Sequence, residues 1–320
     1  MENASTSQLL IPIRQGITRD ETLALAHKVF DQLDAAESTR IDYKYRIQRF
    51  LDHLASSPLD RNSYLEYKRL LADNEEMAVA TKNKYLAAAR VFLKELNRLG
   101  YLPTDITQNV KAFQQDKKHK KDGLTDDEVG QIVARFQTPS GRMDCTDPYM
   151  KPVFRLKVLI ALLAFQGLRQ IEISRLDVQD IDVVHKLAYI RGKGRDDKEP
   201  IFLHPETAEA LRQYLECYGY TEGALFRSES NSSSGQRLST RGIRSIITSH
   251  LRDWGIDKTV HGFRHYFTTR LIKAYKGDLI EVAHYTRHRS LEMLQVYNDR
   301  LQMEADLPRF YGAFEGVSFR

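Results

Sequence analysis

The segment from His261 to Tyr297 gathers residue types that can cleave a phosphodiester. It reads HGFRHYFTTRLIKAYKGDLIEVAHYTRHRSLEMLQVY and places His261, Arg264 and His288 upstream of Tyr297. A second arginine, Arg169, lies far upstream in GLRQIEISRL. Arginine keeps its charge and donates two parallel hydrogen bonds, so it can stabilise the charge that builds on phosphoryl oxygens. We expect the two arginines to hold a DNA phosphate while the Tyr297 hydroxyl attacks it.

Further residues complete the expected chemistry. A phenol with a pKa of about 10 needs its anion stabilised or its proton removed, and the arginines can do the first and a histidine the second. Lys193, at the tip of RGKGRDDK, is the natural general acid for the departing 5′ oxygen, and Lys198 is a weaker candidate. Glu172 lies three residues after Arg169, where its carboxylate can orient the arginine or a histidine, or form only a local helix ion pair.

The elements that must position these residues begin with a small helical domain. Residues 1–17 are expected to be a loose leader. Apolar residues at helical spacing predict four helices, over 18–33, 38–55, 62–73 and 79–99, within a DNA-binding domain of residues 18–113. The second helix carries Arg40 and Lys44 opposite its apolar face, and we expect both to contact DNA. The run QQDKKHKKDG (114–123) is expected to be a solvated linker whose lysines also cross a DNA backbone; they are Lys117, Lys118, Lys120 and Lys121.

The second domain, residues 124–300, is expected to be catalytic and mostly helical. Thr125 and Glu128 match a capping box at its first helix, and a long apolar helix follows over 152–166. Strands over 181–190 and 199–204 are joined by RGKGRDDK, and helices resume at residue 205. The whole chain is therefore expected to be mainly α with one small antiparallel β-sheet. Residues 301–320 form a tail with an apolar face suited to docking, and its apolar residues are Leu307, Phe310, Tyr311 and Phe314.

Composition sets outer limits on the function. The 320 residues carry a net charge of +5, which suits a nucleic-acid partner but is weak evidence alone. Two cysteines make a disulfide framework or a cysteine-based zinc site improbable, so no metal or other cofactor is expected. The first residues lack the features of a signal peptide, and the longest apolar run, KVLIALLAF, is far too short to span a membrane. A cytoplasmic, nucleoid-associated protein is expected.

Taken together, these positions resemble the tyrosine recombinase (phage integrase) family. The match includes GLRQIEISRL, RGKGRDDKEPIFL, HGFRHYFTTRL and RHRSLEMLQVY, and it extends over roughly residues 18–300. The resemblance implies a core-binding helical domain before an integrase-type catalytic domain. It also implies that the tyrosine forms a 3′-phosphotyrosyl bond, consumes neither ATP nor metal, and leaves a 5′ hydroxyl that attacks a partner strand. The residues carried over are the nucleophile Tyr297 and its activating set Arg169, Lys193, His261, Arg264 and His288, with Glu172 in support.

The resemblance also implies an assembly and contains one departure. Such enzymes are tetramers on paired recombination sites in duplex DNA, and they often pass a C-terminal segment to a neighbouring subunit. We therefore expect a monomer in solution that becomes a homo-tetramer on DNA, with accessory DNA-bending factors as further partners. The family has a glycine just before the second histidine, whereas this chain has Arg287. A bulky residue there shifts His288 or adds a phosphate contact.

Three alternatives remain open at this point. Histidines at i and i+4 in HGFRH and HYTRH have zinc-ligand spacing, although the glutamate of HExxH is missing. A DNA-binding protein without catalysis would have the same two-domain basic organisation. A type IB topoisomerase-like enzyme would share the tyrosine chemistry, but the compact helical N-terminal domain favours recombination.

Overall fold

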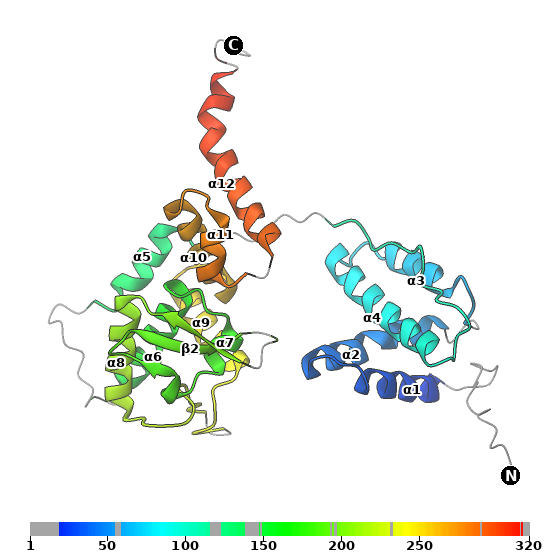
Figure 1. Cartoon of the computed structure of the whole chain (residues 1–320), viewed down its shortest axis with the longest axis horizontal. Coiled ribbons are helices and arrows are strands. Elements are labelled where there is room, and N and C mark those ends of the chain that lie inside the picture. The colour runs from blue at the N-terminus through cyan, green and yellow to red at the C-terminus, as the bar shows by residue number, and fades with distance from the viewer. Residues whose placement is uncertain are drawn as a thin grey trace. The chain divides into compact units, whose positions relative to one another are not determined.

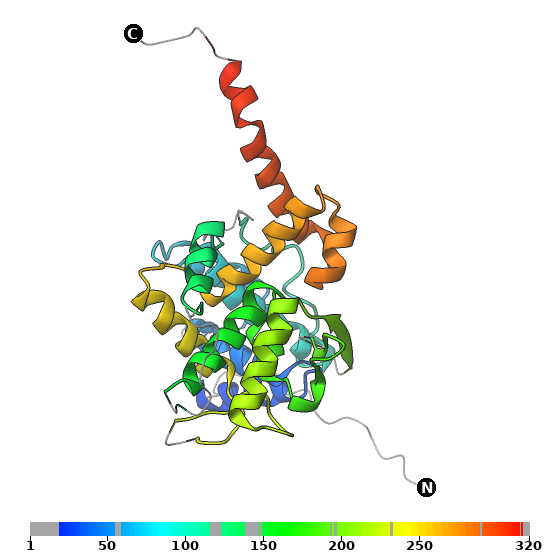
Figure 2. The same ribbon diagram turned by 90° about the vertical axis from the view of Figure 1, so that its left-hand side faces the viewer.

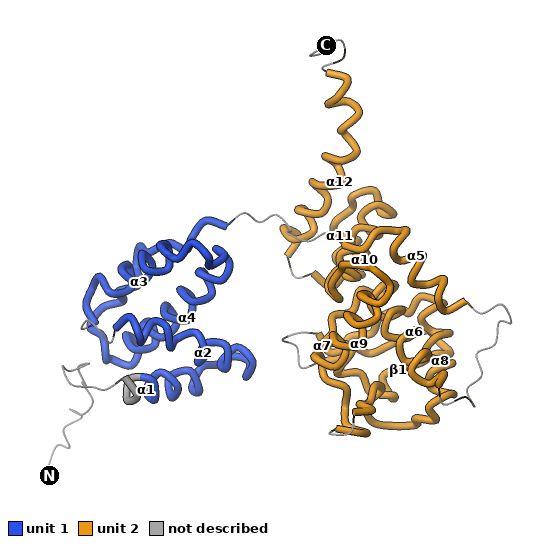
Figure 3. The backbone as a smooth tube through the Cα atoms, turned by 180° about the vertical axis from the view of Figure 1, so that it is seen from behind, with its two compact units in different colours: residues 1–117 blue, residues 118–320 orange. Residues whose placement is uncertain are grey.

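The chain forms two compact units, residues 1–117 and residues 118–320 (Figure 3). The computed structural model describes residues 19–54, 59–115, 123–137, 147, 149–192, 194, 197–230, 233–288, 290–313 and 315. Helices dominate both units, and one small antiparallel sheet lies in unit 2 (Figure 1). The predicted mainly helical class is confirmed. The expected leader, residues 1–17, lies outside the described residues.

Unit 1 is a four-helix domain in its described part. Its helices are α1 (Arg19–Asp31), α2 (Glu37–Leu54), α3 (Ser63–Ala72) and α4 (Val79–Arg98). Aromatic rings hold the core together: Phe30 packs against Tyr43 and Phe92, and Phe50 meets Tyr67 edge to face with ring centroids 4.9 Å apart. The predicted apolar face of α4 is buried, and its members are Leu86, Ala89, Leu93 and Leu96.

After α4 the chain turns back along unit 1. Gly100 takes a left-handed conformation with φ of 81°, and Tyr101 donates its N–H to the carbonyl of Leu96, which closes the helix. The returning segment is fastened to α4 by Asn83, whose side-chain amide both donates to the carbonyl of Phe113 and accepts from its N–H, at 3.0 and 2.8 Å. The end of unit 1 is thus fixed on the helix it follows.

Unit 2 is built around the buried helix α6 (Lys151–Ala164). Helix α5 (Asp126–Ala134) begins with the predicted capping box, since the Thr125 hydroxyl accepts from the N–H of Glu128 and the Glu128 carboxylate accepts from that of Thr125. The remaining elements are α7 (Gln170–Ser174), the 3₁₀ turn η1 (Val178–Asp180), β1 (Ile181–Asp182), β2 (Leu187–Arg191), β3 (Lys198–Phe202), α8 (Pro205–Tyr218), α9 (Thr240–Asp253), α10 (Val260–Ala274), α11 (Leu279–Thr286) and α12 (Leu291–Gly312). One large core contains the buried side chains of α6 and α8 with those of α9.

The sheet has three strands where the sequence predicts two. Its order is β1-β2-β3, all antiparallel, and Tyr189 lies opposite Pro200. The expected strand over 181–190 is broken by a tight turn, because the Asp182 carboxylate accepts from the N–H of His185 at 2.9 Å and Lys186 has a φ of 54°. Such a local carboxylate-to-backbone bond competes with the strand ladder, so one strand becomes a hairpin.

The last three helices form a second, smaller core. Ile272 of α10, Val282 of α11 and Leu294 of α12 are buried against one another, and Tyr297 packs at the edge of this cluster. Helix α12 then continues beyond it, and residues 302–313 are exposed (Figures 1 and 2). Among the described residues, the helices are too short or too polar to cross a membrane.

Candidate active site

Helix α10 presents three polar residues on one face. His261, Arg264 and His265 follow the i, i+3, i+4 spacing, which places them side by side along a helix. Arg264 is only 4% exposed, and its guanidinium donates to the backbone carbonyls of Gly167 and Thr286. Gly167 has a φ of 58° and lies against the ring of Phe267, where an added Cβ would be 2.2 Å from a ring carbon. A glycine is required there to bring the carbonyl to Arg264.

Arg169 stands at the start of α7, and Glu172 in that helix holds it. The Glu172 carboxylate accepts from the Arg169 guanidinium and from the Arg169 backbone N–H, both at 2.8 Å. Glu172 is 1% exposed. Burial by itself raises the pKa of this carboxyl, but the charge of Arg287 and the bonds from Arg169 outweigh it, and the pKa lies below its ordinary value. Glu172 therefore stays ionised and orients Arg169.

Arg287 lies just before His288, at the position where the tyrosine recombinase family has a glycine. It ends α11 in a left-handed conformation with φ of 54°, which explains why a glycine suits this place. Its side chain is 9% exposed and reaches back to Glu172, with 3.4 Å between Nη2 and Oε2. Its Nε lies 3.9 Å from Oε1 of Glu199 on β3. The departure thus adds a third guanidinium to the site.

Three guanidinium groups lie close enough to affect one another. Burial, followed by the charges of Arg169 and Arg287, lowers the pKa of Arg264 to about 9. Burial also lowers the pKa of Arg287, although Glu172 opposes that change. Among the described residues, these three guanidinium groups face two carboxylates, the buried Glu172 and the more exposed Glu199. The remaining positive charge makes the site suited to an anion such as a phosphodiester.

His288 is held as a neutral imidazole whose tautomer can be assigned. The Thr286 hydroxyl donates to the carbonyl of Val282 at 2.9 Å, so its oxygen accepts from Nδ1–H of His288 at 2.7 Å. Nε2 of His288 then carries the lone pair. Burial lowers the pKa of His288 to about 3, followed by the charges of Arg264, Arg169, Arg287 and His261.

Tyr297 lies in the first half of α12 beside the polar face of α10. Its hydroxyl forms a hydrogen bond of 2.6 Å with Nδ1 of His265, and the two rings are 5.1 Å apart. Burial raises the pKa of Tyr297 to about 12, while the charge of Arg264 lowers it. The hydroxyl is therefore protonated at neutral pH and lies within the electrostatic reach of a guanidinium.

The structure brings most of the expected site together. Arg169, Arg264, His288 and Tyr297 meet where α7, α10 and the turn after α11 approach the start of α12, and the His261 charge acts on His288. Lys193 lies outside the described residues, but its neighbour Gly192 accepts a 3.2 Å hydrogen bond from Arg175. The weaker candidate, Lys198, is engaged elsewhere: its ammonium pairs with Asp180 and lies 3.9 Å from Asp177.

The expected DNA-contacting residues of unit 1 have intramolecular partners. Arg40 donates to the carbonyl of Asp31 at 3.1 Å, and Lys44 forms a 2.6 Å ion pair with the Asp31 carboxylate. Both contacts tie α2 to the end of α1. The four lysines expected to cross DNA in the linker lie outside the described residues; they are Lys117, Lys118, Lys120 and Lys121.

One site residue, His265, is absent from the expected set. It directly follows Arg264 and lies four residues after His261, and this spacing by itself indicates only a zinc alternative. The His261 and His265 rings lie perpendicular with centroids 4.6 Å apart, and Nδ1 of His265 is directed at the Tyr297 hydroxyl. Within the described ranges, no three histidine, cysteine, aspartate or glutamate residues come together as a metal site.

The chain is similar to known proteins over most of its length. A sequence model of the phage integrase family matches residues 123–304. The tyrosine recombinase XerC of Lactobacillus delbrueckii subsp. bulgaricus is 24% identical over 237 residues, which cover 71% of this chain and 75% of the relative. The tyrosine recombinase XerD of Staphylococcus epidermidis is 25% identical over 269 residues, which cover 80% of this chain and 85% of the relative.

Solved structures share the fold. The XerH site-specific recombinase in a post-cleavage complex with its palindromic difH substrate aligns with a TM-score of 0.67 at 17% identity, over 91% of this chain and 85% of that one. A lambda integrase dimer bound to a COC′ core site aligns with a TM-score of 0.64 at 17% identity, over 88% and 77%. The expected integrase-type fold is therefore confirmed.

Proposed function

The chain belongs to the phage integrase family and is a site-specific tyrosine recombinase, and we propose that Tyr297 is its nucleophile and that Arg169 and Arg264 activate the scissile phosphate. The observation that carries the proposal is the position of the Tyr297 hydroxyl beside a face that holds Arg264, with Arg169 and Arg287 close to that arginine.

The proposed reaction conserves bond energy. Oη of Tyr297 forms a bond to phosphorus, the bond to the 5′ oxygen breaks, and a 3′-phosphotyrosyl ester remains. Arg169 and Arg264 stabilise the charge on the non-bridging oxygens, and Lys193 gives a proton to the departing 5′ oxygen. The 5′ hydroxyl of a partner strand then reverses these steps, so the strands are rejoined without ATP or a metal.

His261 and His288 take supporting roles in this proposal. His261 lies at the exposed edge of the α10 face, where it can donate a hydrogen bond to a phosphoryl oxygen. His288, fixed by Thr286, lines the other side of the site. A phosphate that entered between them would offset the positive charges that now lower the pKa of His288.

Duplex DNA is the partner, and we propose that unit 1 supplies part of the contacts with its phosphates. Arg46 and Arg49 of α2 lie over the ring of Tyr85 on α4, at 5.3 and 5.9 Å from its centroid, and the exposed Lys84 is next to that tyrosine. We call Arg46, Arg49 and Lys84 the α2–α4 basic seam. Arg46 already pairs with Asp42 through two hydrogen bonds of 2.8 Å, so Arg49 and Lys84 would supply most of the charge that neutralises backbone phosphates. We propose that Arg40 and Lys44, on the same helix as Arg46, also contact DNA.

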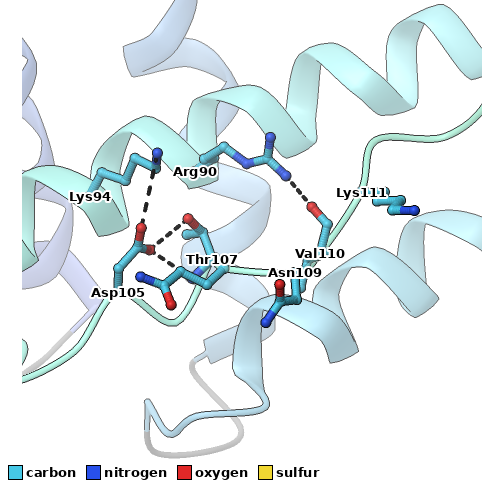
Figure 4. Close-up of a pocket in the computed structure, with 8 residues that line it drawn as sticks. Arg90, Lys94, Asp105, Thr107, Asn109, Val110 and Lys111 are labelled. Atoms are coloured by element: carbon cyan, nitrogen blue, oxygen red, sulfur yellow. Dashed lines mark hydrogen bonds and ion pairs between the residues drawn. The ribbon is translucent and has the colours of Figure 1, made fainter.

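A hollow beside α4 offers a second set of cations in unit 1. Arg90 donates to the carbonyl of Val110 at its wall, Lys94 lies 4.0 Å from Asp105, and Lys111 is exposed at its rim (Figure 4). The Asp105 carboxylate also accepts hydrogen bonds from the hydroxyl and from the N–H of Thr107. We propose that Lys94 and Lys111 reach the DNA backbone, and that the lysines of the linker continue the contact.

We propose that the protein assembles as a tetramer on paired sites through the distal half of α12. This half is exposed and carries Met303, Leu307, Phe310 and Tyr311. An apolar face that is left uncovered on one copy is suited to dock on another. Phe314, also expected on this face, lies outside the described residues.

Covalent trapping tests the proposed function. On a site nicked just downstream of the cleavage point, the short fragment that carries the freed 5′ hydroxyl diffuses away after attack. The wild-type protein should therefore accumulate a DNA adduct and Tyr297→Phe should not. Arg169→Ala and Arg264→Ala should bind the site and form the adduct at least about a hundredfold more slowly, which is about 2.7 kcal/mol of transition-state stabilisation each. Normal binding without an adduct in the wild type would point instead to a silent DNA-binding protein.

A further inference from the structure

His265 is the side chain that contacts the oxygen expected to attack DNA. Its Nδ1 lies 2.6 Å from the Tyr297 hydroxyl, and His265 itself is 8% exposed. It comes from α10, next to Arg264, so the same helix face holds a phosphate-binding guanidinium and an imidazole at the nucleophile. Neither the length of α12 nor the core beneath it requires a polar partner for the phenol, whose ring already packs against the apolar cluster of α10, α11 and α12.

The direction of this hydrogen bond follows from the acidity of the two groups. A phenol is a stronger acid than a neutral imidazole N–H, so the hydroxyl donates and Nδ1 accepts. Burial raises the pKa of Tyr297 to about 12, which keeps the phenol protonated until attack begins. The proton must then leave as the bond to phosphorus forms, and Nδ1 of His265 is a basic atom within hydrogen-bond distance of the hydroxyl.

The other histidines are less suited to receive that proton. His288 donates through Nδ1 to Thr286, and burial together with nearby arginine charges lowers its pKa to about 3, so it resists protonation. His261 stands at the exposed edge, with its ring perpendicular to that of His265. Their positions therefore suit His261 and His288 to contact the phosphate, and suit His265 to accept the phenolic proton.

We propose that His265 is the general base for strand cleavage. This inference rests on the proposed role of Tyr297 as nucleophile. As Oη of Tyr297 forms its bond to phosphorus, the phenolic proton moves to Nδ1 of His265, and the bond from phosphorus to the 5′ oxygen breaks. In rejoining, the imidazolium returns the proton to Oη when the phosphotyrosyl bond is broken by the 5′ hydroxyl. No co-reactant is needed, since the proton is conserved over one cycle.

A different role for the contact makes an opposite prediction. If His265 only fixes Tyr297 in a resting position, removal of the contact would free the nucleophile and leave cleavage unchanged or faster. A general base contributes about a hundredfold to ten-thousandfold, so its loss slows the chemical step. Removal of the contact therefore slows cleavage only if His265 is the general base.

The test measures single-turnover adduct formation on the nicked site with saturating protein. His265→Asn places an amide near the position of Nδ1 that accepts a hydrogen bond but cannot take a proton. We expect normal DNA affinity, a normal unfolding midpoint and adduct formation at least about a hundredfold slower than in wild type. In His265→Ala, added imidazole should restore adduct formation severalfold, because it can enter the space that the side chain leaves. His185→Asn, the same change at an exposed histidine in the β1–β2 turn, should match the wild type.

Each outcome decides the proposal. Adduct formation by His265→Asn within about threefold of wild type overturns it, and so does faster cleavage. A slow His265→Ala that imidazole does not restore also overturns it. If His265→Asn is slow but its unfolding midpoint has fallen, His265→Gln decides: normal folding with cleavage at the wild-type rate overturns the proposal. Failure of the wild type to form an adduct, or an adduct in Tyr297→Phe, would instead refute the nucleophile assignment.

Discussion

The Glu172 carboxylate lies between two arginines in the interior of unit 2. It accepts from Arg169 and lies 3.4 Å from Arg287, whereas Arg264 donates to backbone carbonyls of Gly167 and Thr286. A carboxylate that is buried and doubly paired keeps its charge, and removing it would leave guanidinium groups that repel one another. The left-handed backbone of Arg287 has a strain of order 1–3 kcal/mol that a glycine would avoid.

His288 makes the stability of unit 2 depend on pH. Its pKa is about 3 in the folded protein against an ordinary value of 6.5, so at intermediate pH the unfolded chain binds the extra proton. The free energy of unfolding should therefore decrease as the pH falls below 6.5 and continue to decrease towards pH 3, by at most about 1.4 kcal/mol per pH unit from this residue. Urea unfolding followed by fluorescence can measure this in unit 2 alone, because Trp254 is the single tryptophan.

Substitution at residue 288 separates this effect from general acid sensitivity. His288→Asn can retain a hydrogen bond to Thr286 without titrating, so its stability should change less between pH 6.5 and pH 4. The control His185→Asn alters an exposed histidine and should follow the wild type. Equal slopes for His288→Asn and the wild type would contradict the buried neutral state of His288.

The structure brings together several residues that residue type and spacing single out, but most of the contacts between them could not be predicted from the sequence. The three-residue interval between Arg169 and Glu172 allowed the ion pair that is observed. The bond from His265 to Tyr297 spans 32 positions, and it depends on how α10 packs against α12, which helical periodicity does not specify. The position of Arg287 was evident, but its reach to Glu172 depends on a backbone conformation that is not encoded in spacing.

Secondary structure followed the sequence where local rules decide it. Helix α8 begins at Pro205, where the sequence predicts that helices resume, and it ends at Tyr218 with Gly219 in a left-handed conformation after it. The hairpin over 181–190 was predicted as one strand, because alternating apolar residues continue through it while Asp182 bends the backbone. The prediction from periodicity is therefore wrong where a side chain competes with the backbone hydrogen bonds between strands.

At the level of one helix, the exposed face of distal α12 can be tested. Phe310 and Tyr311 are 55% and 63% exposed, so replacing both with aspartate should change the free energy of unfolding of unit 2 by less than about 0.5 kcal/mol. The same variant should bind a single site normally but lose assembly on paired sites, because a docked apolar face would now bury charge. Analytical ultracentrifugation of the protein on DNA measures the assembly.

The control for α12 is another exposed apolar residue. Val184, which is 79% exposed in the β1–β2 turn, should tolerate aspartate without loss of assembly. Assembly by the Phe310 and Tyr311 variant at the wild-type concentration would show that the distal helix is not the contact between copies.

For the whole molecule, cations in both units imply a strong dependence of DNA affinity on salt. If six or more phosphates are neutralised, the affinity should fall at least about a thousandfold between 50 and 200 mM salt. Lys84→Gln, in the α2–α4 basic seam, should reduce the slope of log affinity against log salt by about one. Arg212→Gln is a suitable control, since Arg212 is already paired with Glu209 and Glu216 on α8. A flat salt dependence measured by fluorescence anisotropy would argue against backbone recognition.

Helix α12 carries both the proposed nucleophile, Tyr297, and the exposed apolar face, and Pro308 lies between Tyr297 and Phe310. Thirteen positions separate Tyr297 from Phe310, which is about 20 Å along a helix. If a second copy docks on the far end, the contact between copies and the Tyr297 hydroxyl belong to the same helix, so assembly and bond breaking would be coupled. A single copy on DNA would lack that contact, and strand breaks without a partner strand for rejoining would then be rarer.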